Sequence, residues 1–209
     1  MTGRYQEYSE YKDSGVDWFG KIPSHWKIAG FKKHINSIVD YRGKTPVKTD
    51  DGVLLVTARN IKSGKLDYSL SQEFISPDDF DDVMSRGKAE NGHVLFTTEA
   101  PLGEVANIDR TNIALAQRII KFDGLKNELN NFYFKYLIMC EEFQQSLNLF
   151  ASGSTVKGIK AERFVYLRNL LPPYQEQQKI AKFLDHETAK IDTLIAKQEK
   201  LIELLKEKR

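Results

Sequence analysis

Residues 169–187 read NLLPPYQEQQKIAKFLDHE, and this stretch joins two very different kinds of sequence. Pro172 and Pro173 end an apolar run, because proline lacks the backbone N–H that the interior of a strand or helix needs. Proline is, however, well tolerated at the start of a helix. From Tyr174 to Arg209 the chain contains neither glycine nor proline. The stretch therefore predicts a strand that stops at the prolines and a long helix that begins after them.

The predicted C-terminal helix, called the arm below, carries apolar residues at steps built from threes and fours, which is the pattern of a helical seam. At about 1.5 Å per residue the arm would be about 50 Å long, too long for a domain of this size to cover. Glu187 and Gln198 interrupt the seam, as residues that fix register or partner do. We expect the arm to pair with a partner helix through Ile180, Leu184, Ile191, Leu194, Leu201 and Leu205.

Strand-like and helix-like segments are mixed upstream of the arm. Ser76 and Pro77 are typical of a helix N-cap and first helical residue, and a second helix is predicted over 127–150. Four apolar runs between turn-forming residues predict strands: HWKIAGF (25–31), GVLLVTA (52–58), GHVLFTT (92–98) and IALAQRIIKF (113–122). The sequence thus predicts an α+β fold, with a mixed α/β domain over 1–171 and the arm over 172–209.

The composition is that of a globular protein with a sizeable core. The 209 residues are 41% hydrophobic and carry a net charge of +2, and no apolar run approaches the length of a membrane span. The polar N-terminal residues lack the apolar centre of a signal peptide. Cys140 is the only cysteine, which excludes an internal disulfide and a cysteine-based metal site. We expect a cytoplasmic protein.

The motifs that could carry catalysis are incomplete. Pro172-Pro173-Tyr174 matches part of an amino-methyltransferase motif, but the preceding residue must accept a hydrogen bond and Leu171 cannot. The chain also lacks a glycine-rich turn that would hold a nucleoside cofactor after its first strand. Its four histidines have no paired metal-ligand spacing, and GSTVKGIK (153–160) lacks the spacing of a phosphate loop. We therefore expect no catalytic centre and no metal site.

Charge is distributed unevenly despite the small net value. Between residues 41 and 65 six basic side chains face only two acidic ones, whereas EFISPDDFDDV (73–83) is strongly acidic. Such segregation predicts one basic face and one acidic face, and a basic face suits an anionic partner such as nucleic acid.

Four segments, taken in order, resemble the specificity subunits of type I restriction–modification systems: YSEYKDSGVDWFGKIPSHWKI (8–28), DYRGKTP (40–46), VLFTTEAPLGEVANI (94–108) and GSTVKGIKAERFVYLRNLLPPYQEQQKIAKFLD (153–185). The resemblance implies a subunit that reads double-stranded DNA and has no catalytic centre or cofactor of its own. S-adenosylmethionine would be bound only by a methyltransferase partner subunit, through which a restriction subunit would join. No membrane partner is implied.

The same resemblance implies two target recognition domains held apart by paired helices, whereas this sequence has one domain and one helix. We therefore expect a natural half-subunit or a shortened form, with two copies pairing through the arm. A symmetric pair would read an inverted repeat, because the two-fold axis of the protein is imposed on the DNA.

DNA recognition needs cations for phosphates and polar groups for base edges, and the sequence offers these in three loops. Gln117 and Arg118, placed in the strand predicted over 113–122, either read bases or mark its solvent face. An alternative is an assembly module that binds no DNA and dimerises through the arm. The expected DNA-binding residues are Arg42, Lys44, Thr45, Lys48, Arg59, Asn60, Lys62, Lys65, Ser154, Thr155, Lys157 and Lys160.

Overall fold

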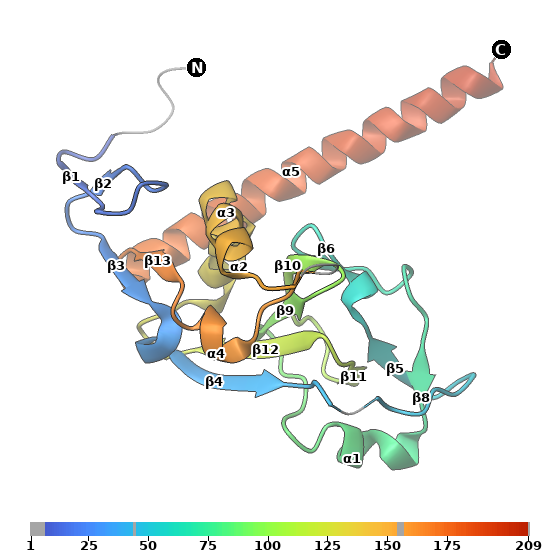
Figure 1. The fold of residues 1–209 in the computed structure, drawn as a ribbon. Coiled ribbons are helices and arrows are strands. Elements are labelled where there is room, and N and C mark those ends of the chain that lie inside the picture. Colours follow the sequence, from blue (N-terminus) through green and yellow to red (C-terminus); the bar gives the residue numbers. More distant parts are fainter. Residues whose placement is uncertain (1–6, 44, 154–156, 209) are drawn as a thin grey trace.

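The structure, a computed structural model, describes residues 7–43, 45–153 and 157–208. A domain of short strands and helices carries the long helix α5 (Tyr174–Glu207), which diverges from the domain toward its C-terminal end (Figure 1). The other helices are α1 (Phe80–Val83), α2 (Asn131–Met139), α3 (Glu141–Phe150) and α4 (Ala161–Phe164). The strands are β1 (Tyr11–Asp13), β2 (Lys21–Pro23), β3 (Lys27–Gly30), β4 (Ile35–Asp40), β5 (Val53–Val56), β6 (Ile61–Lys62), β7 (Lys65–Leu66), β8 (Phe74–Ile75), β9 (Val94–Thr98), β10 (Leu102–Asn107), β11 (Ile113–Leu115), β12 (Ile119–Gly124) and β13 (Arg168–Leu171). The predicted α+β class with a long C-terminal helix is confirmed.

An antiparallel sheet of four strands, in the order β10-β9-β12-β4, forms the centre of the domain. Successive side chains of a strand point to opposite faces of a sheet. In β9, Val94 and Phe96 enter one hydrophobic cluster, whereas Leu95 between them enters another. Every residue of β9 is buried. The sheet is therefore covered on both faces, and the two clusters together form the core.

The first cluster is rich in aromatic rings and lies between the sheet and the helices α2, α3 and α4. Phe164 of α4 lies at its centre, with ring centroids 4.7 Å from Phe122 and 4.8 Å from Phe96. Large buried rings of this kind supply much of the apolar area of a core. Ala181 and Ile180 of α5 pack against the same cluster, so the first turns of the arm are part of the domain core.

The second cluster covers the opposite face of the sheet and includes the smaller sheet β11-β5-β8. In this sheet β11 and β5 are parallel, with Ile113 opposite Leu54 and Leu115 opposite Val56. Because parallel strands end at the same edge of a sheet, the residues that follow β5 and β11 emerge side by side. This edge carries the candidate site described below.

Two elements that the sequence predicts as continuous are each broken into two in the structure. The strand predicted over 113–122 is broken into β11 and β12 by a turn at residues 116–118, where Arg118 has a φ of 76°. The helix predicted over 127–150 is broken into α2 and α3 at Cys140, whose φ of −68° and ψ of 148° are extended rather than helical. Neither break contains a glycine or proline, which is why the sequence did not reveal it.

The strand stop and helix start predicted around the two prolines are confirmed. Strand β13 ends at Leu171 and pairs with β3, and Pro173 is the N-cap of α5. The start predicted at Ser76 is also confirmed, since its hydroxyl accepts a hydrogen bond from the Asp78 N–H and Pro77 follows it. The domain boundary placed at 171/172 stays a prediction.

Candidate nucleic-acid interface

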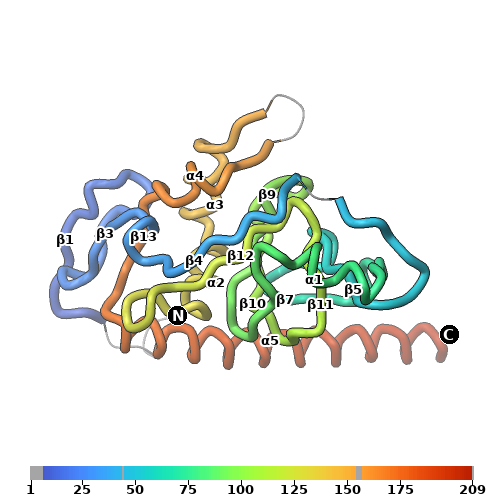
Figure 2. Tube along the Cα trace, turned by 90° about the horizontal axis from the view of Figure 1, so that it is seen from below, coloured from blue at the N-terminus to red at the C-terminus, as the bar shows by residue number. Residues whose placement is uncertain are grey.

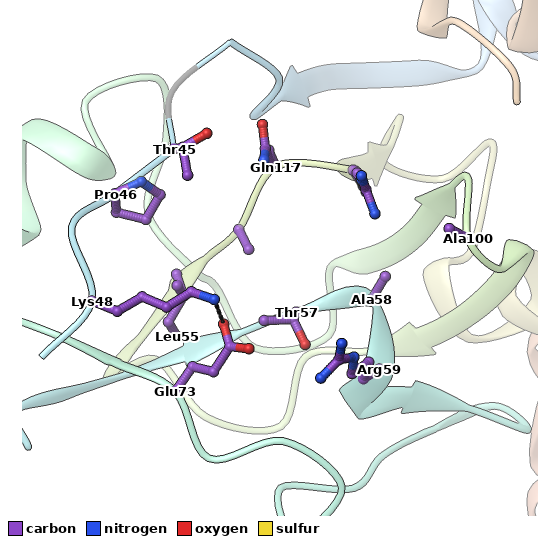
Figure 3. Close-up of a pocket in the computed structure, with 12 residues that line it drawn as sticks. Thr45, Pro46, Lys48, Leu55, Thr57, Ala58, Arg59, Glu73, Ala100 and Gln117 are labelled. Atoms are coloured by element: carbon purple, nitrogen blue, oxygen red, sulfur yellow. Dashed lines mark ion pairs between the residues drawn. The ribbon is translucent and has the colours of Figure 1, made fainter. Parts of the chain in front are cut away.

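An open cleft of about 240 Å³ lies at the edge where β5 and β11 end (Figure 3). Five parts of the chain line it: the loop after β4, the end of β5 with the turn after it, Glu73 before β8, Ala100 between β9 and β10, and the turn after β11. We call this feature the cleft, and its polar side chains are Thr45, Lys48, Thr57, Arg59, Glu73, Gln117 and Arg118. The structure therefore brings together three residues of the predicted DNA-binding set and the two polar residues predicted beside them.

Arg59 is an exposed cation of the cleft that no carboxylate holds within the described residues. It lies in the 3-10 turn Ala58–Asn60, directly after β5. Within the described residues it forms no ion pair, and Figure 3 shows it among the cleft residues. A guanidinium presents several N–H donors in a planar fork, which suits phosphate oxygens and the guanine edge alike.

Asn60, the next residue, was predicted to contact DNA, and this prediction is wrong because its side chain is fully buried. Its Oδ1 accepts a hydrogen bond of 2.9 Å from the Thr57 N–H, and its Nδ2 donates to the carbonyls of Asp67 and Ser71 at 3.0 and 2.8 Å. Buried polar atoms with hydrogen-bond partners of this kind stabilise the local fold. Asn60 shapes the turn that presents Arg59.

Gln117 and Arg118 occupy the turn that breaks the predicted strand. Gln117 is half-buried, and its amide can both donate to and accept from a base edge. Arg118 is exposed, and its Nε lies 3.0 Å from Oε1 of Glu99. Both side chains therefore line the cleft because the chain leaves the sheet here, not because they face solvent from a continuous strand.

Two further cations at or near the cleft are also held by carboxylates. Lys48 pairs with Glu73 at 2.8 Å inside the cleft. Arg42 pairs with Asp40, and its Nε lies 2.9 and 2.8 Å from the two carboxylate oxygens. Hydrogen bonding to Asp40 raises the pKa of the Arg42 guanidinium. Each of these cations can bind a phosphate only in competition with its carboxylate.

The loop that carries Lys157 and Lys160 approaches the cleft from the other side. Gly158 pairs with Glu99 in an isolated bridge, and the Ile159 N–H donates to the Thr98 carbonyl at 3.1 Å. Lys157 and Lys160 are exposed beside this bridge. Both lysines thus lie near the residue that holds Arg118. Lys44, Ser154 and Thr155 lie outside the described residues.

Lys62 and Lys65 lie apart from the cleft, although the sequence grouped them with Arg59. They belong to the hairpin β6–β7, and Lys65 forms an ion pair with Asp192 of α5. Figure 2 shows α5 along one side of the domain, whereas the end of β4, which leads to the cleft, lies on the other side. Lys65 therefore holds the arm.

The predicted arm seam is divided into two parts by its surroundings. Ile180 is partly buried against the core and Leu184 is half-buried, so the domain itself covers part of each side chain, and their contact with a partner stays a prediction. Beyond them the seam is open: Ile191, Leu194, Leu201 and Leu205 are 50–59% exposed. An open apolar row of this kind is typical of a helix that pairs with another helix.

Two negative findings apply to residues 7–43, 45–153 and 157–208. No three or more His, Cys, Asp or Glu side chains there gather in a way that could hold a metal ion. No helix in these ranges is long and apolar enough to cross a membrane.

Residues 32–204 match the family described as the type I restriction modification DNA specificity domain. This match covers most of the chain. The chain belongs to this family. It is 24% identical over 205 residues to the type I restriction enzyme EcoKI specificity subunit of Escherichia coli (strain K12), covering 90% of this chain and 41% of that protein. The chain thus spans less than half the length of this relative.

Two solved structures have a similar fold. One is the HsdS subunit from Thermoanaerobacter tengcongensis, which is 17% identical and has a TM-score of 0.56 over 88% of this chain and 41% of that one. Another is a chain from a structure concerned with complex assembly and conformational transition of the type I R-M system, with 17% identity and a TM-score of 0.62 over 88% of this chain and 42% of that one. These structures agree with the α+β fold expected from the sequence, and the family match agrees with the resemblance seen in the sequence.

Proposed function

We propose that the chain recognises a specific sequence in double-stranded DNA, as the specificity subunit, or half of one, of a type I restriction–modification complex. The observation that supports this most is the cleft, which brings Arg59, Gln117 and Arg118 together at one sheet edge. The chain also matches a family described by DNA specificity. Arginine and glutamine are the side chains that read guanine and adenine edges in the major groove.

The proposal assigns chemistry to the partners and recognition to this chain. A methyltransferase subunit would bind S-adenosylmethionine and modify the DNA, and a restriction subunit would join through it. This chain would be non-catalytic and cytoplasmic, and would bring neither cofactor nor metal. Phosphate contacts from Lys157 and Lys160 would set the register, while the cleft would read the bases.

The proposal includes pairing of two copies through the exposed part of the arm, from Ile191 to Leu205. An apolar row half exposed along about four turns supports a helical partner. Two copies related by a two-fold axis would place two clefts on one duplex and read an inverted repeat.

The test is selection from a randomised duplex DNA pool by the chain co-purified with its methyltransferase subunit at moderate salt. Enrichment of an inverted repeat is the expected result. Enrichment of a single half-site would keep sequence reading but contradict symmetric pairing. No enrichment by an intact assembly would contradict the proposed function.

A protein assembly module that binds no DNA is the second candidate. The observation that favours it is that Arg42, Lys48 and Arg118 are all neutralised by neighbouring carboxylates, which lowers the attraction for phosphates. This candidate predicts that the assembly shows no salt-dependent DNA binding, whereas DNA recognition predicts affinity that falls steeply with salt.

A further inference from the structure

The carboxylates around the cleft suggest how this chain discriminates between DNA sequences, and this inference rests on the proposed function. Glu73 holds Lys48 at 2.8 Å and Glu99 holds Arg118 at 3.0 Å, whereas Arg59 has no carboxylate partner within the described residues. We propose that Glu73 and Glu99 are specificity-determining residues that weaken the binding of non-cognate DNA. They do so by neutralising two cleft cations until a matching base sequence offers both partners of each pair new contacts.

The first step of the argument concerns attraction to phosphate. Binding of non-cognate DNA comes almost entirely from cations that replace the counterions of the phosphates. A cation that already holds a carboxylate offers less net charge to a phosphate, and the carboxylate itself repels the duplex. Both carboxylates remain partly accessible, with 22% of the Glu73 side chain and 41% of the Glu99 side chain exposed, so DNA at the cleft would meet them.

The second step concerns the cognate complex. A glutamate can accept a hydrogen bond from the amino group of cytosine, and the arginine or lysine it releases can donate to guanine. Both partners of a broken pair are then satisfied only on a matching sequence. On other sequences the carboxylate faces DNA without a donor, and a polar group that loses its partners is costly. The pairs therefore penalise the wrong sequence more than the right one.

The positions of the two pairs support a role at the DNA surface. Figure 3 shows Lys48 and Glu73 meeting inside the cleft, near Thr57 and Arg59. Glu99 lies beside the loop of Lys157 and Lys160 through its bridge to Gly158. Asp40, which holds Arg42, also accepts a hydrogen bond from the Arg42 backbone at 3.0 Å. Its replacement would disturb the loop, so Glu73 and Glu99 are the better residues to test.

The experiment compares E73Q, E99Q and the double variant with the wild-type assembly, because glutamine keeps the shape and removes the charge. The probes are the duplex enriched by selection and a scrambled duplex of the same composition. We expect each substitution to tighten binding of the scrambled duplex about fivefold, the effect of one unit charge at about 4 Å in water. Binding of the enriched duplex should stay the same or weaken, so the ratio of the two affinities should fall at least about fivefold.

The matched control is E128Q, which removes one carboxylate whose Oε2 lies 2.8 Å from His34 Nδ1. Glu128 and His34 lie beyond the ends of β12 and β4 opposite to the cleft, roughly 17 Å away along the strands at about 3.3 Å per residue. E128Q should leave both affinities unchanged. Thermal unfolding of every variant verifies that it is folded, and the more exposed Glu99 keeps the test available if E73Q is unstable.

The outcomes separate this inference from the proposed function. Affinity for the scrambled duplex that is unchanged in both single variants would overturn the inference and leave DNA reading intact. An equal gain for both duplexes would also overturn it, because it would indicate a general charge effect. A wild-type assembly that binds the two duplexes equally would overturn the proposed function together with the inference.

Discussion

At the scale of single residues, one buried amide fixes the base of the arm. Gln177 is 1% exposed, and its Oε1 accepts a hydrogen bond of 2.9 Å from the Asn130 N–H. Its Nε2 donates to the carbonyls of Glu128 and Pro172 at 2.8 and 2.9 Å. One side chain thus joins α5 to the start of α2 and to Pro172, which follows β13.

Replacing Gln177 with alanine should therefore destabilise the protein strongly. Three backbone groups would lose their partners, and unsatisfied buried groups of this kind cost about 1–3 kcal/mol each before relaxation and water entry. We expect Q177A to lower the free energy of unfolding by about 2–4 kcal/mol in urea denaturation. Q178A is the control, because Gln178 is exposed on the same turn. Equal stability of the two variants would contradict the role given to Gln177.

Glu176 ties the N-terminal segment to the same turn of α5. Its carboxylate accepts hydrogen bonds from the Tyr8 hydroxyl and, at 3.1 Å, from Trp26 Nε1, and it lies 2.9 Å from His25 Nε2. Partial burial opposes the charged form, but these hydrogen bonds outweigh it and lower the pKa of Glu176 below its usual value of 4.5.

This shift makes the contact sensitive to acid. A lowered pKa in the folded state adds stability that is fully present above the usual value and is lost as the pH falls through the folded value. E176Q should therefore cost about 1 kcal/mol at pH 7, since the contact is partly exposed, and less at pH 3. Urea unfolding at the two pH values measures this difference. E199Q, on the exposed part of the same helix, is the control for removing one charge from α5.

Residues with a local physical signature were predictable from the sequence, whereas residues defined by distant partners were not. Pro173 and Ser76 act through their own backbone or the next turn, and both were placed correctly. Asn60 follows a strand in a basic segment and so resembles a surface residue. Its burial depends on the carbonyls of Asp67 and Ser71, which only the folded chain brings to it.

At the scale of elements, the arm has two halves with different partners. Its first turns pack on the domain through Ile180 and Ala181, while the row from Ile191 onward is exposed. The helical period was readable from the sequence because it is a local pattern. The sequence could not divide the row, because the same period serves a core and a partner helix.

The two halves of the arm should respond differently when an aspartate replaces an apolar residue. We expect L201D to leave thermal unfolding of the domain unchanged and to convert paired chains to monomers in analytical ultracentrifugation, because its site is 50% exposed. I180D should instead lower the unfolding temperature, since an uncompensated charge in a core is strongly unfavourable. Unchanged size of L201D at all concentrations would show that the exposed row does not pair copies.

At the scale of the whole molecule, the cleft exists because parallel pairing of β5 and β11 brings their ends together. Gln117 is far from Lys48 and Arg59 in sequence, and a single sequence carries no record of which loops meet. The basic segment between residues 41 and 65 was recognisable, but the fold divides it between two sides. Arg59 lies in the cleft, and Lys65 lies against the arm at Asp192.

This division gives opposite expectations for two cations only six positions apart. R59A should weaken binding of the enriched duplex by about 5- to 150-fold, because a planar donor fork at a base edge is worth about 1–3 kcal/mol. K65A should leave that affinity unchanged and should instead loosen the arm, since it removes the contact with Asp192. The two variants carry the same change in charge, so a general electrostatic effect would weaken DNA binding by both alike.

Fluorescence anisotropy with the enriched duplex measures the affinities, and hydrogen exchange along α5 measures how firmly the arm packs on the domain. Weaker binding by K65A with normal binding by R59A would reverse the assignment and place the DNA on the side of the arm.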